Sequence, residues 1–234
     1  MTPREYTAPT ALPAVRVVGI GDDGCASLTS KAMEAVLTAS VLAGGERQLA
    51  FFPQFEGRRI AFKGGLKDTL EELRELSEDN NVCVLASGDP LFFGVGSLIV
   101  KTIGAEHVRV LPQPSSVQWA FARLGLKWDD AEVLSLHGRP LHGLAARLRT
   151  RAKVALLTDA GNSSARAIAR HLLQYNQRGW RAHLCENLLG PGERVRSMSL
   201  EQLAGAGDIA PLHVLVLTRE DADWRAPPTP AYLP

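Results

Sequence analysis

Short apolar runs alternate with amphipathic stretches along almost the whole chain. The first run, residues 15–20, precedes a helix predicted to begin near Thr29 or Ser30, and a second short strand is predicted over residues 39–43. An amphipathic helix then leads into a strand at residue 82, and its buried face carries Leu66, Leu70, Leu73 and Leu76. Strands that alternate with helices predict an α/β fold built in layers.

The same alternation continues in the second half of the chain. Strands are predicted over residues 108–111, 133–136, 154–157, 182–186, 195–198 and 213–217. Ser115 with Gln118 three residues later forms a capping-box pattern, and Gly125 ends the helix that it opens. The prolines around this helix start predict a boundary between two α/β domains. We place these domains at residues 14–113 and 114–220, with loose tails at 1–13 and 221–234 and an irregular stretch at 44–64.

Composition excludes several classes of protein. The 234 residues carry 26 Lys and Arg against 25 Asp and Glu, a net charge of +1, which gives no general case for binding nucleic acid or an anionic membrane. No apolar run approaches the roughly 20 residues of a membrane span, and the first residues lack the apolar core of a secretion signal. The three cysteines are far apart and never spaced as Cys-x-x-Cys, and the histidines show no metal-ligand spacing. We therefore expect a cytoplasmic protein without a disulfide framework or a metal site.

A small-residue turn interrupts the chain after the apolar run at residues 82–86. Ser87, Gly88, Asp89 and Pro90 stop the predicted strand, because glycine tolerates unusual backbone angles, aspartate bonds its own backbone and proline fixes the exit direction. Such loops at the carboxyl ends of strands are where open α/β sheets bind ligands. The alternative is an ordinary strand-to-helix turn in which Asp89 only caps the backbone. Phe92 and Phe93, which follow, are more typical of a core than of a ligand surface.

A glycine pattern after the first strand suggests a different ligand. Gly19, Gly21 and Gly24 satisfy the G-x-G-x-x-G pattern of dinucleotide sites. Two points count against a dinucleotide. Asp22 and Asp23 would repel a pyrophosphate. A dinucleotide site also needs the helix amides at the third glycine, whereas here the helix is predicted to start several residues later.

Several segments together resemble the tetrapyrrole methyltransferase family, whose members methylate uroporphyrinogen and corrin intermediates with S-adenosylmethionine. The resemblance covers roughly residues 15–218 and is carried by residues 18–24 with 28–29, by 87–90 with Gly94 and Gly96, and by 112–116. Residues 135–140 and 186–193 look most like the precorrin-7 C5-methyltransferase branch of the family. The implied fold is two α/β domains with the cofactor in a cleft between them, in a homodimer. The implied activity is methylation of carbon 5 of precorrin-7 or cobalt-precorrin-7 in cobalamin biosynthesis.

The resemblance also implies roles for particular residues. The cofactor would be bound by Ser87, Gly88, Asp89, Phe92, Ser115, Ser116, Leu212 and His213. The substrate would be bound by Asp22, His137 and Arg139. Many family members have proline at the position of Asp22, and Ser115 could be a plain helix cap. No catalytic residue is assigned, because methyl transfer needs positioning and desolvation more than a protein nucleophile.

Other interpretations stay open at this stage. Arg58, Arg59 and Lys63 are alternatives to Arg139 for holding the carboxylates of a corrinoid, and His137 with Arg139 could equally be a solvated pair. The acceptor could be another molecule, or the chain could be a non-catalytic tetrapyrrole-binding protein of the pathway. Some relatives carry a second, decarboxylating methyltransferase module, which here is expected as a separate protein.

Overall fold

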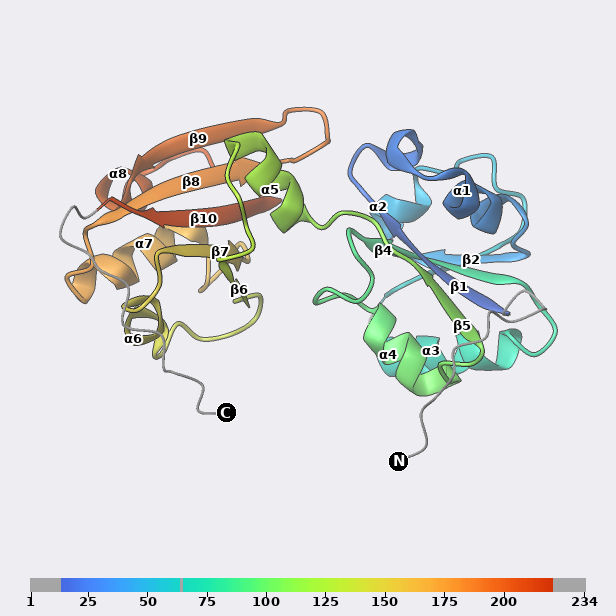
Figure 1. Cartoon of the computed structure of the whole chain (residues 1–234). Helices are drawn as coiled ribbons and strands as arrows, with labels where there is room; N and C mark the ends of the chain where they lie inside the picture. Colours follow the sequence, from blue (N-terminus) through green and yellow to red (C-terminus); the bar gives the residue numbers. More distant parts are fainter. Residues whose placement is uncertain (1–13, 64, 221–234) are drawn as a thin grey trace, which may run out of the picture. The chain divides into compact units, whose positions relative to one another are not determined.

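A computed structural model describes residues 14–63 and 65–220, which form two compact units that divide between Ser115 and Ser116 (Figure 1). Each unit has its own five-stranded sheet with helices packed on it, so the predicted α/β fold class is confirmed. The predicted tails at 1–13 and 221–234 lie outside the described residues.

The first unit is an open parallel sheet with the strand order β3-β2-β4-β1-β5. Its strands are β1 (Val15–Ile20), β2 (Val41–Gly44), β3 (Arg58–Ala61), β4 (Val82–Ser87) and β5 (Val108–Leu111). Its helices are the 3-10 turn η1 (Gly24–Ser27), α1 (Ser30–Leu37), α2 (Glu46–Leu49), α3 (Leu66–Leu76) and α4 (Gly96–Ile103). The connections between parallel strands therefore carry these helices, as the alternation of the sequence predicts.

Alternate side chains of each strand point to opposite faces of this sheet. Val15, Val17 and Val84 pack with Leu73 of α3 and Ile99 of α4. The other face is covered by α1 and α2, and its buried residues include Val18, Ile20, Leu42, Leu85, Val36 and Leu49. Helices cover both faces, so the central strands are buried along their length and read as continuous apolar runs.

The second unit is a mixed sheet with the strand order β6-β7-β10-β8-β9. Its elements are α5 (Ser116–Leu124), β6 (Glu132–Ser135), α6 (Leu144–Leu148), β7 (Lys153–Leu157), α7 (Ala165–Gln174), β8 (Trp180–Glu186), β9 (Arg194–Ser199), α8 (Leu200–Ala204) and β10 (His213–Arg219). β6 and β7 are parallel, whereas the other pairs are antiparallel. Helices α6, α7 and α8 pack on one face and α5 on the other.

The stretch at 44–64 is not wholly irregular, as the sequence suggested, because it contains α2 and β3. β3 pairs with β2 at the edge of the sheet, and Ile60 is its one buried residue. An edge strand with a single buried side chain leaves no apolar run to detect. The sequence pattern does not predict helix α4 either, because this segment is rich in β-branched residues, which are equally typical of strands.

The Arg59 side chain is used to stabilise the loop between α2 and β3. Its guanidinium donates to the backbone carbonyls of Leu49, Phe52, Pro53 and Phe55. We expect Arg59→Lys to lower the free energy of unfolding by about 1–2 kcal/mol, because lysine cannot span these acceptors. The neighbouring Arg58→Lys is the control, since Arg58 forms an exposed ion pair with Glu72. Urea unfolding that gives equal losses for both variants would contradict this role.

Candidate functional site

The connections that leave the carboxyl ends of β1 and β4 run to opposite faces of the first sheet. The connection after β1 leads to α1 on one face, whereas the connection after β4 leads to α4 on the other. β1 and β4 are neighbours, and Ile20 at the end of β1 pairs with Ser87 at the end of β4. The two loops diverge here, and the strand ends at such a point are where open α/β sheets bind ligands. The predicted residues Asp22, Ser87, Gly88 and Asp89 all lie at this point.

Backbone segments approach one another closely at this strand edge. The Gly88 amide donates to the Ile20 carbonyl at 2.9 Å. A Cβ atom on Gly19 would lie 2.3 Å from the Gly88 carbonyl oxygen and 2.9 Å from the backbone nitrogen of Gln113, so no side chain fits there. Gly88 has φ of +62°, in the left-handed region that favours glycine. The unusual backbone angle expected at Gly88 is therefore confirmed.

The loop after Gly88 is held by its own backbone. Asp89 Oδ1 accepts a hydrogen bond from the Leu91 amide at 2.8 Å, which is the turn role that the sequence allowed. A Cβ atom on Gly94 or Gly96 would lie 2.6 Å from the Pro90 carbonyl oxygen. These two glycines are thus required by the packing of the loop itself. Asp89 Oδ2 has no hydrogen bond to the residues that the structure describes.

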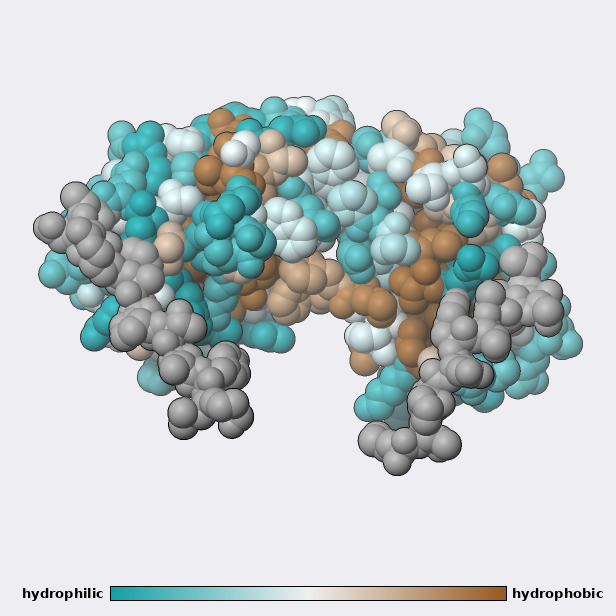
Figure 2. Space-filling view, in the orientation of Figure 1, coloured by the Kyte–Doolittle hydropathy of each residue, from teal (hydrophilic) through white to brown (hydrophobic). Residues whose placement is uncertain are grey.

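Phe92 and Phe93 are exposed, which corrects the expectation that they belong to a core. Their exposed fractions are 36% and 54%, and their ring centroids lie 4.8 Å apart at 68°. Phe93 has φ of +56°, which is rare for an aromatic residue. Leu91 is also exposed, and Figure 2 shows hydrophobic residues gathered on the segment that joins β4 to α4. The loop therefore presents apolar side chains beside the strand ends.

Arg47 on α2 ties the two strand-end loops together and was not predicted as a site residue. Its Nη1 lies 2.8 Å from Asp22 Oδ1, and its Nη2 donates to Ser87 Oγ at 3.4 Å. Asp22 is therefore not an isolated carboxylate. α2 directly follows the carboxyl end of β2, so the order of the sheet, which a single sequence does not reveal, brings Arg47 to this edge.

The first glycine loop is built for packing rather than for a dinucleotide. Ser27 donates to Asp23 at 2.8 Å, and the buried Gln113 donates to Ser27 Oγ at 2.7 Å, so Asp23 joins a network to the end of β5. A Cβ atom on Gly24 would lie 2.6 Å from the ring of Phe51. Helix α1 begins at Ser30, as predicted, too late for its amides to meet a phosphate at Gly24.

The second sheet gathers the remaining predicted residues at one edge. The carboxyl ends of β6, β7 and β8 and the start of β10 share this edge, because β6 and β7 are parallel and β10 runs antiparallel to both β7 and β8. His137 and Arg139 follow β6, and Leu212 and His213 begin β10. The structure places Ser115 at the last position of the first unit and Ser116 at the first turn of α5.

The loop after β6 is fixed by the loop after β7. Asp159 Oδ2 accepts from the Gly138 amide at 3.1 Å, and Ser163 Oγ donates to the Arg139 carbonyl. The Gly138 amide, together with those of Gly161 and Ser163, lowers the pKa of Asp159 against the opposing effect of desolvation. The exposed guanidinium of Arg139 makes no hydrogen bond or ion pair within the described part of the chain. The loop contacts therefore fix the backbone of Arg139, whereas its guanidinium is not engaged by the described residues.

Glu186 organises the same edge and was missed as an individual site residue. Its side chain is 1% exposed and accepts from Arg194 Nε at 2.9 Å, Arg196 Nε at 3.0 Å and the Ala210 amide at 2.9 Å. Glu186 is opposite Arg194 in the β8–β9 pair, and Arg196 lies two residues further on the same face. The register of this hairpin therefore surrounds one buried carboxylate with two arginines.

Comparison with known proteins identifies the family. Residues 14–204 match the model of the tetrapyrrole (corrin/porphyrin) methylases. The chain belongs to this family. It is 38% identical to the cobalt-precorrin-7 C(5)-methyltransferase of Salmonella typhimurium over 76% of this chain and 87% of that protein. It is 35% identical to the decarboxylating precorrin-6Y C(5,15)-methyltransferase of a Sinorhizobium species over 88% of this chain and 49% of the relative, so it spans about half of that protein.

A solved structure supports the fold of this methylase. The uroporphyrin-III C-methyltransferase of Thermus thermophilus, complexed with S-adenosylhomocysteine, aligns with a TM-score of 0.69 at 23% identity over 87% of this chain and 96% of that one. The predicted family and the predicted methyltransferase class of the enzyme are confirmed by these comparisons.

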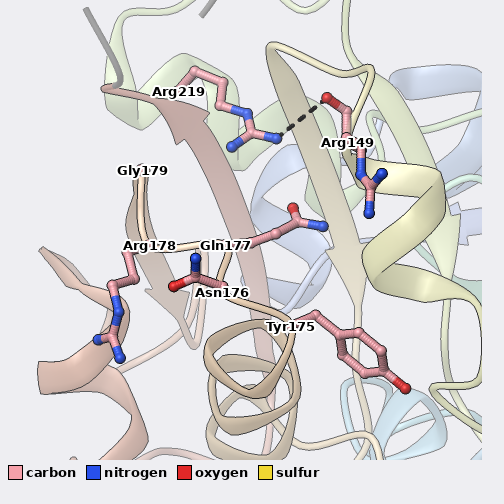
Figure 3. Close-up of a pocket in the computed structure, with 7 residues that line it drawn as sticks. All are labelled: Arg149, Tyr175, Asn176, Gln177, Arg178, Gly179 and Arg219. Atoms are coloured by element: carbon pink, nitrogen blue, oxygen red, sulfur yellow. Dashed lines mark hydrogen bonds between the residues drawn. The ribbon is translucent and has the colours of Figure 1, made fainter.

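A cavity of about 520 Å³ in the second unit lies away from the predicted residues of this methylase (Figure 3). It is lined by Arg149, Tyr175, Asn176, Gln177, Arg178, Gly179 and Arg219, at the opposite edge of the sheet from His213. Arg219 donates to the carbonyls of Leu148 and Arg149, as the dashed line in Figure 3 marks for Arg149. Arg178 pairs with Glu201. These guanidinium groups hold local structure, and we assign no ligand to the cavity.

Among the residues of the methylase that the structure describes, no cluster of three or more His, Cys, Asp or Glu side chains is placed to hold a metal ion. No helix within residues 14–63 and 65–220 has the length and apolar character needed to cross a membrane.

The buried carboxylate of Glu186 gives the methylase a testable pH dependence. Desolvation raises its pKa, but hydrogen bonds from Arg194, the Ala210 amide and Arg196 outweigh this, so the pKa lies below the ordinary 4.5. A pKa lowered by folding adds stability that is present above the unfolded value and is lost as the pH falls through the folded value. We expect Glu186→Gln to flatten the decline in unfolding free energy below about pH 4.5, measured by urea denaturation. Glu34→Gln, exposed on α1, is the control, and an identical slope in wild type and Glu186→Gln would contradict the assignment.

Proposed function

We propose that this chain transfers a methyl group from S-adenosylmethionine to carbon 5 of precorrin-7 or cobalt-precorrin-7 in cobalamin biosynthesis. The observation that carries this proposal is the 38% identity to the cobalt-precorrin-7 C(5)-methyltransferase of Salmonella typhimurium over most of both chains. Two segments resemble this branch, residues 135–140 and 186–193. They begin at the carboxyl ends of β6 and β8, which lie at the same edge of the second sheet. This shared location favours a common role in recognising the ligands.

The residues at the two sheet edges suit S-adenosylmethionine. Asp89 Oδ2 would accept from the ammonium group of the methionine portion, and we propose that Ser87 and Gly88 contact the same portion. The exposed ring of Phe92 supplies an apolar neighbour. We propose that Ser115, Ser116, Leu212 and His213 also contact the cofactor. S-adenosylhomocysteine in the Thermus thermophilus relative supports this choice of cofactor.

Methyl transfer requires mainly that the protein position the methyl donor and the acceptor. S-adenosylmethionine, when bound, supplies an electrophilic methyl group on a sulfonium. The side chains of this protein then hold donor and acceptor in line, and Leu91, Phe92 and Phe93 exclude water beside the strand ends. No protein nucleophile is required for a displacement of this kind.

Cationic groups at both edges suit an acceptor rich in carboxylates. We propose that Arg139 binds one substrate carboxylate and that His137 adds a further donor. Asp22 enters the proposal as a pair with Arg47, because Arg47 neutralises its charge and presents its own guanidinium beside the strand ends. Arg58, Arg59 and Lys63 are poorer candidates, because Arg58 pairs with Glu72, Lys63 pairs with Glu46 and Arg59 holds a loop.

We extend the proposal to the surroundings of the enzyme. The chain would act as a homodimer in the cytoplasm without a resident metal ion. A separate decarboxylating methyltransferase of the same pathway would act on the same corrinoid skeleton, because the decarboxylating relatives are named for two positions, C5 and C15.

Two measurements test the proposal. Calorimetry should detect binding of S-adenosylhomocysteine and none of NAD, and the reverse result would overturn the choice of cofactor. Labelled S-adenosylmethionine should then be offered with precorrin-7, its cobalt form and earlier ring intermediates in parallel reactions. Transfer to a different intermediate would assign another acceptor to the same fold, and cofactor binding without transfer to any of them would point to a non-catalytic role.

A further inference from the structure

The carboxylate of Asp159 joins two loops at one edge of the second sheet. The loop after β6 carries Gly138 and Arg139, which are both exposed. Asp159, in the loop after β7, accepts the Gly138 amide through Oδ2 at 3.1 Å. Its other oxygen, Oδ1, accepts the amides of Gly161 at 2.8 Å and Ser163 at 3.0 Å within its own loop. The two oxygens of Asp159 therefore divide between the two loops.

Ser163 holds the next residue of the loop after β6. It is fully buried, and its Oγ donates to the Arg139 carbonyl. The Arg139 amide donates to the Leu136 carbonyl at 3.0 Å, which closes a turn. Gly138, inside this turn, has φ of +66°, in the left-handed region that favours glycine. Hydrogen bonds therefore fix the backbone on both sides of the Arg139 side chain.

A fixed backbone is an advantage for an exposed cation that binds an anion. An arginine on a mobile loop loses backbone and side-chain freedom on binding, and this loss of conformational entropy weakens the affinity. The anchor itself is strong, because an amide that donates to an ionised carboxylate forms a stronger hydrogen bond than one that donates to a neutral oxygen. The Gly138 amide is the largest cause of the lowered pKa of Asp159, so this carboxylate stays ionised at neutral pH.

We propose that Asp159 is a positioning residue for the corrinoid acceptor, and that with Ser163 it holds the Arg139 guanidinium ready for a carboxylate of this acceptor. The inference rests on the proposed function, which assigns Arg139 to the acceptor. It adds Asp159 and Ser163, which act through the loop rather than on the acceptor. If Asp159 instead contacted the acceptor directly, like charges would repel, and removing its charge would improve binding. The sign of the change in affinity therefore separates the two roles.

Asp159→Asn isolates the link between the loops. Asparagine keeps one acceptor oxygen for the amides of its own loop, whereas its NH2 group cannot accept from the Gly138 amide. The Michaelis constant for the acceptor should rise about tenfold, with turnover and the affinity for S-adenosylhomocysteine at their wild-type values. Asp130→Asn is the matched control and should behave as wild type. Asp130 bonds to Lys153 at 2.8 Å, at the amino end of β7 and so at the opposite edge of the sheet.

A double-mutant cycle distinguishes positioning of Arg139 from a general loss of structure. In an Arg139→Ala background, Asp159→Asn should change the Michaelis constant by less than about twofold, because the side chain that it positions is gone. Ser163→Ala removes the second anchor, should raise the constant about threefold, and is the variant to use if Asp159→Asn does not fold.

The outcomes separate this inference from the proposed function. A wild-type or lower Michaelis constant in the folded Asp159 variant, a tenfold effect that persists without the Arg139 side chain, or a matching loss of S-adenosylhomocysteine affinity would overturn the inference alone. If Asp159→Asn does not fold, a wild-type constant in Ser163→Ala would do the same. Absence of methyl transfer to precorrin-7 or its cobalt form by the wild-type chain would overturn the proposed function as well.

Discussion

Replacing Gly88 by valine is expected to abolish measurable binding of S-adenosylhomocysteine while leaving a folded protein. Gly88 lies in the left-handed region, at φ of +62°, where a β-branched residue is strongly disfavoured. The backbone penalty of about 1–2 kcal/mol lowers stability modestly. The strained turn would also shift the Gly88 carbonyl, which lies against Gly19, so we expect affinity to fall at least about 100-fold.

Gly125→Val is the matched control for this experiment. Gly125 follows helix α5 with φ of +65°, and nothing lies within 4 Å of the position of an added Cβ atom. Its valine variant should therefore show the same backbone penalty and an unchanged affinity for S-adenosylhomocysteine. If Gly88→Val folds and binds with wild-type affinity, Gly88 is only a turn residue and the cofactor is bound elsewhere.

Arg139→Lys is expected to weaken binding of the corrinoid acceptor by about 1–3 kcal/mol, the range for hydrogen bonds to charged groups. A guanidinium can bind a carboxylate through two parallel hydrogen bonds, whereas an ammonium cannot copy that geometry. The guanidinium of Arg139 is exposed and is not used by the described residues, so the substitution should leave folding unchanged. Affinity for the cofactor should also stay at the wild-type value.

Steady-state kinetics with the acceptor varied measure this effect. Arg109→Lys, exposed on β5, is the control and should behave as wild type. An unchanged Michaelis constant and turnover for Arg139→Lys would refute the assignment and would direct attention to Arg47 instead.

The elements that could be predicted from the sequence are those whose burial leaves a local pattern. The bounds of β5 and the starts of α1 and α3 follow from apolar runs or periodic leucines, since these patterns depend on near neighbours alone. β3 escaped prediction because its single buried residue, Ile60, packs through the register with β2.

The residues of the candidate site also differ in how far the sequence could predict their roles. The special backbone of Gly88 could be anticipated, because glycine between serine and Asp-Pro is typical of a tight turn. The role of Arg47 could not, since it requires β2, β4 and β1 to be neighbours in that order. Glu186 was noticed only as part of a family segment. Its role depends on the β8–β9 register, which places Arg194 opposite the carboxylate, and on the distant amide of Ala210.

Methyl transfer to carbon 5 of the corrinoid ring can be detected from the position of a labelled methyl group in the product. The purified chain is incubated with S-adenosylmethionine labelled with ¹³C in the methyl group and with precorrin-7 or its cobalt form, and the product is analysed by NMR. We expect one new labelled methyl group, bonded to carbon 5, and no label with Gly88→Val. Label at any other carbon, or no transfer to either acceptor by a wild-type chain that binds the cofactor, would contradict it.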